Sequence, residues 1–347
     1  MGDGWITRRG LRVLMVTLLA LAAPPAGAAE AFNPSPHAID APPWFRETFL
    51  DFREDVREAA REGKRLLVYF GQDGCPYCRE LMRAGFGDKA IADKTRRHFH
   101  AIAINVWADR EATWTDGRIF TEKTLAAFLK VQFTPTLLFL DEGGAVALRL
   151  NGYYPPHKLH AALDYVSGRN EKKTAFADYL ARHAREPASG TLHEQPFFLK
   201  PPLDLDRSRR PATRPLAVLF EQRECAACDE LHRQGFAHPD VRALVRKFDV
   251  ARLELFGTQR LVTPGGRSLT AEQWGRELKI AYTPTLVFFD EKGVESFRVE
   301  AYLKPFHLVS SLDYVASGAY RGEPSFQRYL QRRAERIRAA GGRVELW

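Results

Sequence analysis

The 347-residue sequence predicts an α/β protein that contains two similar domains in tandem. Residues 75–86 (CPYCRELMRAGF) recur as residues 225–236 (CAACDELHRQGF), and residues 133–141 (FTPTLLFLD) recur as residues 282–290 (YTPTLVFFD). A period of about 150 residues is far too long for a solenoid repeat and indicates a duplicated domain. Within each copy, short apolar runs suited to buried strands alternate with apolar-periodic segments suited to helices.

The elements of the two copies are expected in the same order. The first copy should be preceded by an amphipathic helix at residues 44–63 that contains Phe45, Phe49, Phe52 and Val56. In both copies a buried strand leads into a Cys-x-x-Cys that opens a helix. A Gly-containing hairpin joins the last two strands, and an apolar helix closes the copy. Strands are expected at 66–70, 101–107, 137–140 and before Tyr153, then at 216–220, 250–256, 286–289 and before Tyr302; the closing helices are expected at 157–166 and 307–315.

Composition and charge exclude several classes of protein. Hydrophobic residues make up 45% and charged residues 27%, which excludes a disordered chain and collagen. The formal charge is +8, but no motif that reads DNA or RNA accompanies it, so we expect no nucleic-acid partner. We interpret the arginines of a C-terminal helix, expected at 325–340, as a solvated helix face.

Residues 1–28 have the three parts of a secretory signal peptide. Arginines precede an apolar stretch at 13–23, and small residues follow at 26–28. A transmembrane helix needs about 20 apolar residues, so we expect cleavage and no stable membrane insertion. The predicted location is the bacterial periplasm, where disulfides form and persist.

The remaining chain divides into three predicted parts. The first domain is expected at 40–186 and the second at 215–340. Between them, residues 187–214 form a proline-rich, largely extended linker, and Phe197–Leu199 within it are candidates for docking on a domain.

All four cysteines, Cys75, Cys78, Cys225 and Cys228, belong to a Cys-x-x-Cys pair. A cysteine at a helix N-terminus faces unpaired N–H groups and the positive end of the helix dipole, which favour the thiolate. Cys75 and Cys225 are therefore the predicted nucleophiles, and Cys78 and Cys228 the resolving thiols. A purely structural disulfide is the alternative, but so short a loop contributes little stability. The wide separation of the two pairs excludes a shared zinc ribbon.

A strand, a short turn, Cys-x-x-Cys, a helix and a later Thr-Pro-Thr together resemble the thioredoxin fold. The resemblance covers roughly residues 65–175 and 215–325, and it implies two thioredoxin-like domains, each a central mixed sheet flanked by helices. More narrowly, residues 72–78 and 220–222 are similar to periplasmic thioredoxin-related proteins found with sulfur-oxidation systems.

The resemblance also implies a substrate-binding loop in each copy. Thr134-Pro135 and Thr283-Pro284 match the cis-proline position of the family, which lies beside the active sulfurs. In the family, the backbone of the residue before this proline pairs with the substrate chain. We therefore expect these four residues to bind substrate.

Two positions depart from the family pattern. Tyr69 and Leu219 stand where thioredoxins carry a buried aspartate that assists proton transfer to the resolving thiol. Glu221 lies near the motif in the second copy and is a candidate substitute, whereas the first copy has Gly71 there. The Cys-Ala-Ala-Cys sequence of the second copy is also an unusual redox pair.

The sequence thus predicts a periplasmic thiol–disulfide oxidoreductase that acts on protein cysteines through a mixed disulfide, in the reducing or isomerising direction. We expect no cofactor and no metal, and the resemblance implies an inner-membrane thiol-electron donor. Two alternatives stay open. One is a client-binding chaperone or assembly factor whose cysteines are not catalytic, and the other is copper delivery through Cys225, Cys228 and His232.

Overall fold

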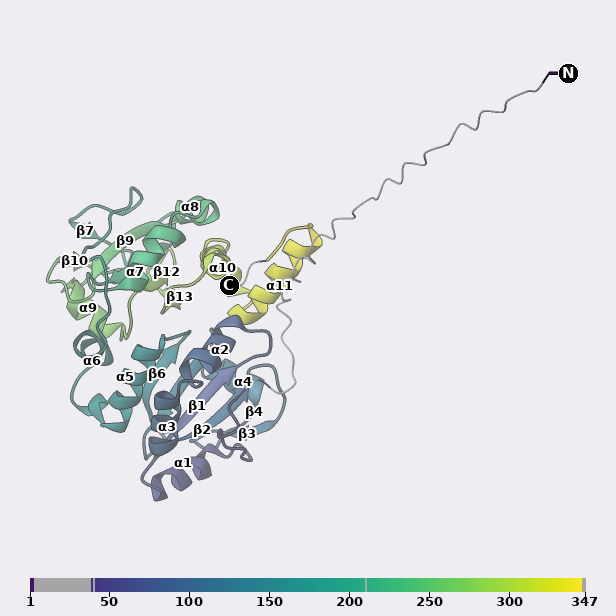
Figure 1. The fold of residues 1–347 in the computed structure, drawn as a ribbon. Helices are drawn as coiled ribbons and strands as arrows, with labels where there is room; N and C mark the ends of the chain where they lie inside the picture. Colours follow the sequence, from purple (N-terminus) through teal and green to yellow (C-terminus); the bar gives the residue numbers. More distant parts are fainter. Residues whose placement is uncertain (3–38, 40, 210, 345–347) are drawn as a thin grey trace.

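The computed structural model describes residues 1–2, 39, 41–209 and 211–344. Apart from its first two residues, the predicted signal peptide lies outside this range. Over the residues described, no helix is both long and apolar enough to cross a membrane. Figure 1 shows two domains, each built from a sheet with helices packed on it. This confirms the α/β class with two tandem domains.

The sheet of the first domain has the strand order β2-β1-β5-β6. β1 pairs with β2 in parallel and with β5 antiparallel, so the sheet is mixed as predicted. Every residue of β1 is buried, which agrees with the apolar run at 66–70, and Arg65 at its start is paired with Glu142 and Glu171. The elements of this domain are α1 (Phe52–Arg61), β1 (Arg65–Gly71), α2 (Pro76–Glu80), the π-helical turn η1 (Leu81–Gly85), α3 (Lys89–His98), β2 (Phe99–Asn105), β3 (Glu111–Thr113), β4 (Ile119–Thr121), α4 (Glu122–Phe128), β5 (Thr136–Leu140), β6 (Val146–Asn151), α5 (Pro156–Ser167), η2 (Asn170–Lys172) and α6 (Phe176–His183).

The second domain repeats this arrangement, with the strand order β13-β12-β8-β9 and β8 parallel to β9. In both domains the helix after the Cys-x-x-Cys continues into a π-helical turn. The elements of this domain are β7 (Leu203–Asp204), β8 (Leu216–Glu221), α7 (Ala226–Glu230), η3 (Leu231–Gly235), α8 (Pro239–Val245), β9 (Asp249–Glu254), β10 (Arg260–Val262), β11 (Ser268–Thr270), α9 (Ala271–Glu277), β12 (Thr285–Phe289), β13 (Glu295–Val299), α10 (Pro305–Ala316), η4 (Ala319–Arg321) and α11 (Phe326–Ala339).

The helix predicted within residues 44–63 is shorter than expected. It begins only at Phe52, where the side chain of Asp51 accepts a hydrogen bond from the N–H of Arg53. Leu50 has a φ of 59°, a left-handed conformation that cannot continue a right-handed helix. As a result Phe49, part of the predicted amphipathic helix, is exposed.

The segment 187–214, predicted as a linker, contacts the second domain along much of its length. Phe198 forms a β-bridge with Val250 and is buried in the core of this domain. Further on, β7 pairs in parallel with β10. The Phe197–Leu199 part therefore docks on the second domain, while the predicted domain boundaries stay predictions.

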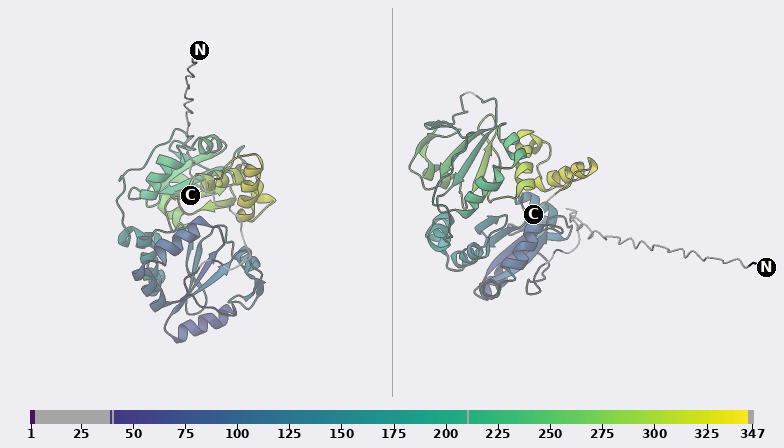
Figure 2. Two further views of the ribbon diagram at one scale, coloured as in Figure 1. Left: turned by 45° about the vertical axis from the view of Figure 1, so that its right-hand side comes forward. Right: turned by 45° about the horizontal axis from the view of Figure 1, so that its top comes forward.

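The two domains pack against each other through aromatic residues. Phe133 of the first domain lies with its ring centroid 5.3 Å from Phe326 and 5.6 Å from Phe297 of the second. Tyr154 and Tyr282 make a second contact at 4.5 Å. Both views in Figure 2 show the domains side by side. The residues just before the two Thr-Pro loops, Phe133 and Tyr282, thus sit at the interface.

Candidate redox sites

Each Cys-x-x-Cys stands at the start of a helix, as the dipole argument requires. Cys75 is the N-cap of α2, and its Sγ accepts a hydrogen bond of 3.1 Å from the N–H of Cys78. Cys225 is the N-cap of α7 and makes the same 3.1 Å contact with Cys228. Both pairs form disulfides with Cα atoms 5.2 Å apart. The same backbone donors would stabilise a thiolate at Cys75 or Cys225 after reduction.

The two Thr-Pro loops lie beside these sulfurs. The Thr134–Pro135 and Thr283–Pro284 peptide bonds are both cis. In the first domain, the Thr134 hydroxyl donates to Cys75 Sγ at 3.4 Å, and the Thr134 carbonyl oxygen is also 3.4 Å from this sulfur. The structure therefore brings Thr134 to Cys75 directly. In the second domain, Thr283 and Cys225 line the same pocket.

Tyr69 takes up the space behind the first redox site. Its side chain is buried, and a Cβ added at Gly71 would lie only 2.1 Å from the Tyr69 hydroxyl oxygen. In the second domain Leu219 is equivalent to Tyr69, and Glu221 is equivalent to Gly71. The polar side chain behind the second redox site is therefore that of Glu221. The two departures from the family pattern thus belong together.

We predict that Gly71→Ala destabilises the protein by about 1–3 kcal/mol, because the new methyl group has no room beside Tyr69. Denaturant unfolding of the wild type and the variant would measure this. The matched control is Tyr69→Leu combined with Gly71→Ala, which resembles the second domain and should recover part of the loss. Equal unfolding midpoints for Gly71→Ala and wild type would contradict the prediction.

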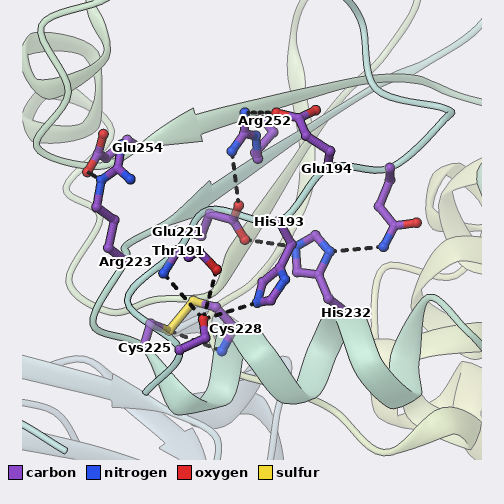
Figure 3. A network of polar contacts seen from close by, with 12 residues as sticks. Thr191, His193, Glu194, Glu221, Arg223, Cys225, Cys228, His232, Arg252 and Glu254 are labelled. Carbon is purple, nitrogen blue, oxygen red and sulfur yellow. Dashed lines mark hydrogen bonds and ion pairs between the residues drawn. A yellow bond between two sulfur atoms is a disulfide. The ribbon is translucent and has the colours of Figure 1, made fainter. Parts of the chain in front are cut away.

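A buried ion pair lies behind the second redox site. Glu221 is 1% exposed, and one of its carboxylate oxygens lies 2.9 Å from His232 Nε2. Arg252 is 3.8 Å from the other oxygen, and Gln195 contacts His232 Nδ1 at 3.1 Å. His232 follows Cys228 by one helical turn, and Figure 3 shows His232 directed toward Glu221. Glu221, the predicted substitute for the family's buried aspartate, is therefore buried near the second redox site, where its carboxylate contacts His232.

The copper alternative needs Cys225, Cys228 and His232 in one ligand set. Within the described part of the chain, no three His, Cys, Asp or Glu side chains are grouped so that they could hold a metal ion. Both ring nitrogens of His232 already have hydrogen-bond partners, Glu221 at Nε2 and Gln195 at Nδ1. The structure does not bring the three proposed ligands together.

The linker also covers the start of α7, which sequence reasoning did not anticipate. Asp229 accepts hydrogen bonds from the backbone N–H and the hydroxyl of Ser189, at 2.7 and 2.6 Å. His193 lies 2.6 Å from the same carboxylate, and its ring is 4.7 Å from that of His232 (Figure 3). These contacts span about 40 residues of sequence and follow no periodic pattern, so no local signal marks them.

Residues of the other domain help to line the space beside Cys75 and beside Cys225. Cys75 is 5% exposed and faces a cavity of about 20 Å³, which Tyr302, Leu303 and His307 of the second domain help to line. Cys225 is 2% exposed and borders a larger pocket of about 320 Å³. Residues of the first domain that line this pocket include Lys158, Leu180, Ala184 and Glu186.

Burial sets the charge state of one group in these linings, and hydrogen bonding sets that of another. It lowers the pKa of His307 to about 4, so this histidine is neutral at pH 7. Burial alone would raise the pKa of Glu186, but hydrogen bonds from His157 and Lys158 outweigh it and lower this pKa to about 2. The first site is therefore lined in part by a neutral imidazole and the second by a charged pair.

We predict that His307 makes the protein less stable as the pH falls from about 6.5, the ordinary pKa of histidine, to about 4. In this window the unfolded chain binds a proton that the folded chain does not. The loss should approach about 3 kcal/mol at pH 4, relative to His307→Gln. Unfolding of both proteins across this range would show it, and parallel pH profiles would refute it.

The family model of the thioredoxin-like domain (Thioredoxin_2) matches residues 52–167 and 204–316. No curated protein matches. Among solved structures, a thioredoxin-fold protein from Helicobacter pylori is 24% identical, covering 39% of this chain and 90% of that one, with a TM-score of 0.32. A protein disulfide oxidoreductase from Aeropyrum pernix is 14% identical, covering 79% and 97%, with a TM-score of 0.24. The chain belongs to the thioredoxin-like domain family and carries two copies of that domain.

Proposed function

We propose that this protein is a periplasmic thiol–disulfide oxidoreductase that acts on protein cysteines in the reducing or isomerising direction. One observation carries the proposal: each domain holds a Cys-x-x-Cys whose first sulfur caps a helix beside a cis Thr-Pro loop. A helix N-terminus favours a thiolate, and the thiolate is the species that attacks a disulfide.

In the reducing direction, the Cys75 thiolate attacks one sulfur of a client disulfide, and the other client sulfur leaves as a thiolate. The Cys78 thiol then loses its proton and attacks Cys75 Sγ in the mixed disulfide. This releases the client's second sulfur, which takes up a proton, and leaves the Cys75–Cys78 disulfide. Cys225 and Cys228 would act in the same way. A dithiol donor resets each site, and no cofactor takes part.

The proposed export, the inner-membrane electron donor and the link to sulfur oxidation are all inferred from the sequence. The periplasmic location follows from residues 1–28 and is tested by fusing a reporter after residue 30 and locating it. The inner-membrane dithiol donor follows from the family resemblance. The narrower similarity of residues 72–78 and 220–222 to proteins of sulfur oxidation stays a prediction.

The proposed activity is tested with insulin as the disulfide substrate and a dithiol as the electron donor. We expect the full chain to accelerate insulin reduction, and we expect a variant with all four cysteines replaced by serine not to do so. Equal rates for the two proteins would contradict the proposal. If the two proteins reduce insulin equally and the variant without cysteines still binds a client protein, the chaperone alternative is favoured.

A further inference from the structure

The closing helices of the two domains occupy equivalent places at the two redox sites. The third residue of α5 is Lys158, and the third residue of α10 is His307. Lys158 lines the pocket that contains Cys225, and His307 lines the cavity that contains Cys75. Each helix therefore brings one nitrogen-bearing side chain to the lining of the other domain's redox site.

His307 packs against the first site, and no described residue forms a hydrogen bond with its Nδ1. The side chain packs edge-on against Tyr77 of the Cys-Pro-Tyr-Cys sequence, with ring centroids 5.1 Å apart. The Tyr77 hydroxyl accepts a hydrogen bond of 2.9 Å from the N–H of Lys304, one turn before His307. His307 is only 6% exposed, and Nδ1 lacks a hydrogen-bond partner among the described residues.

A second polar group in the same cavity is also unpartnered. The hydroxyl of Tyr302 is buried, and within the described residues it makes no hydrogen bond. An unmade hydrogen bond of a buried group costs about 1–3 kcal/mol. Two residues that line the cavity of Cys75 thus each carry a buried polar atom without a partner among the described residues, and a thiolate in this cavity would offer a hydrogen-bond acceptor that the disulfide does not.

Lys158 holds the matching position in the second site with a charge. It is 7% exposed, forms an ion pair of 2.6 Å with Glu186 and contacts the Tyr282 hydroxyl at 3.2 Å. Its Nζ also lies 4.7 Å from the centre of the Tyr282 ring, next to the Thr283-Pro284 loop. A buried ammonium group favours a negative charge placed near it.

We propose that the two domains complete each other's redox sites, with His307 stabilising the Cys75 thiolate and Lys158 stabilising the Cys225 thiolate. Reduction by a dithiol supplies two electrons and one retained proton, turning the Cys75–Cys78 disulfide into a Cys75 thiolate and a Cys78 thiol. The donor becomes a disulfide and releases its second proton to solvent. His307 and Lys158 act on the sulfurs as positioning residues.

The test measures the thiol–disulfide equilibrium constant of one pair at a time in the full chain. The Cys75 pair is isolated by Cys225→Ser with Cys228→Ser, and the Cys225 pair by Cys75→Ser with Cys78→Ser. Each protein is equilibrated in dithiothreitol buffers at pH 7, and its reduced fraction is counted by alkylation and mass measurement.

We expect His307→Leu to shift the Cys75 pair toward the disulfide by about tenfold, or about 30 mV, because the reduced state loses a hydrogen-bond donor. His307→Gln, which keeps an N–H donor, should stay within about threefold of wild type. We expect Lys158→Met to shift the Cys225 pair in the same direction by at least as much. If His307→Leu does not fold, His307→Met takes its place.

Measuring each substitution on the cysteine pair of the other site distinguishes a local effect on one thiolate from a general weakening of the domain interface. His307→Leu should leave the constant of the Cys225 pair within about twofold, and Lys158→Met should do the same for the Cys75 pair. Shifts in both pairs from either substitution, or in neither, would overturn the inference. The inference rests on the proposed function, but the equilibrium needs no client. Unchanged constants with intact insulin reduction would refute only the inference, and shifted constants without insulin reduction would refute only the function.

Discussion

Replacing Cys75 and Cys225 together by serine is expected to slow insulin reduction by at least about a thousandfold, which corresponds to about 4 kcal/mol of activation free energy. Each of these sulfurs caps a helix, where backbone donors favour a thiolate. A serine hydroxyl in the same place is not ionised at neutral pH, so it cannot attack a disulfide. Initial rates at a fixed dithiol concentration give the measurement.

The resolving cysteines supply the matched control. Cys78→Ser with Cys228→Ser keeps both nucleophiles and should still attack insulin, but the reaction should stop at the mixed disulfide. The single variants Cys75→Ser and Cys225→Ser divide the rate between the domains. Full activity in the Cys75→Ser, Cys225→Ser protein would show that the helix-capping sulfurs are not the nucleophiles.

Glu221→Ala should lower the free energy of unfolding by about 3 kcal/mol. Glu221 is almost fully buried, and its removal leaves buried His232 with Gln195 as its remaining side-chain hydrogen-bond partner among the described residues, whereas Arg252 keeps its 2.6 Å ion pair with Glu194. Breaking one side of a buried ion pair is costly because the remaining group has lost its water as well as its partner. Glu221→Gln, which keeps one oxygen for His232, should cost less.

The control for this prediction is a surface ion pair on β9, the strand that pairs with the strand of Glu221. Glu254, at the end of β9, pairs with Arg223 at 3.2 Å, and both side chains are substantially exposed. Glu254→Ala should therefore change stability by less than about 1 kcal/mol. A similar loss for Glu221→Ala and Glu254→Ala would show that the buried pair contributes no more than a surface contact.

Much of the fold could be predicted because its signals are local. The apolar runs at 66–70 and 216–220 became fully buried central strands, and the two Cys-x-x-Cys pairs stand at helix N-termini. The helix start at Phe52 was missed because the left-handed conformation of Leu50 has no glycine or proline to announce it.

The candidate sites could be predicted only in part. The cysteines and the Thr-Pro loops repeat in the sequence, so the duplication itself points to them. His307 and Lys158 gave no such signal, because each occupies an ordinary position in an amphipathic helix and its partner lies in the other domain. Contacts across a domain interface depend on how the domains pack, and hydrophobic periodicity within one copy carries no information about that.

The central claim is that Cys75 and Cys225 exchange disulfides with protein cysteines, and trapping the mixed disulfide tests it most directly. The Cys78→Ser, Cys228→Ser protein is reduced, mixed with an oxidised protein substrate, quenched with an alkylating agent and digested without reductant. We predict linked peptides in which the substrate cysteine is joined to Cys75 or Cys225. If Cys75 and Cys225 are instead recovered only as alkylated, unlinked peptides while the substrate stays oxidised, the proposed exchange does not occur.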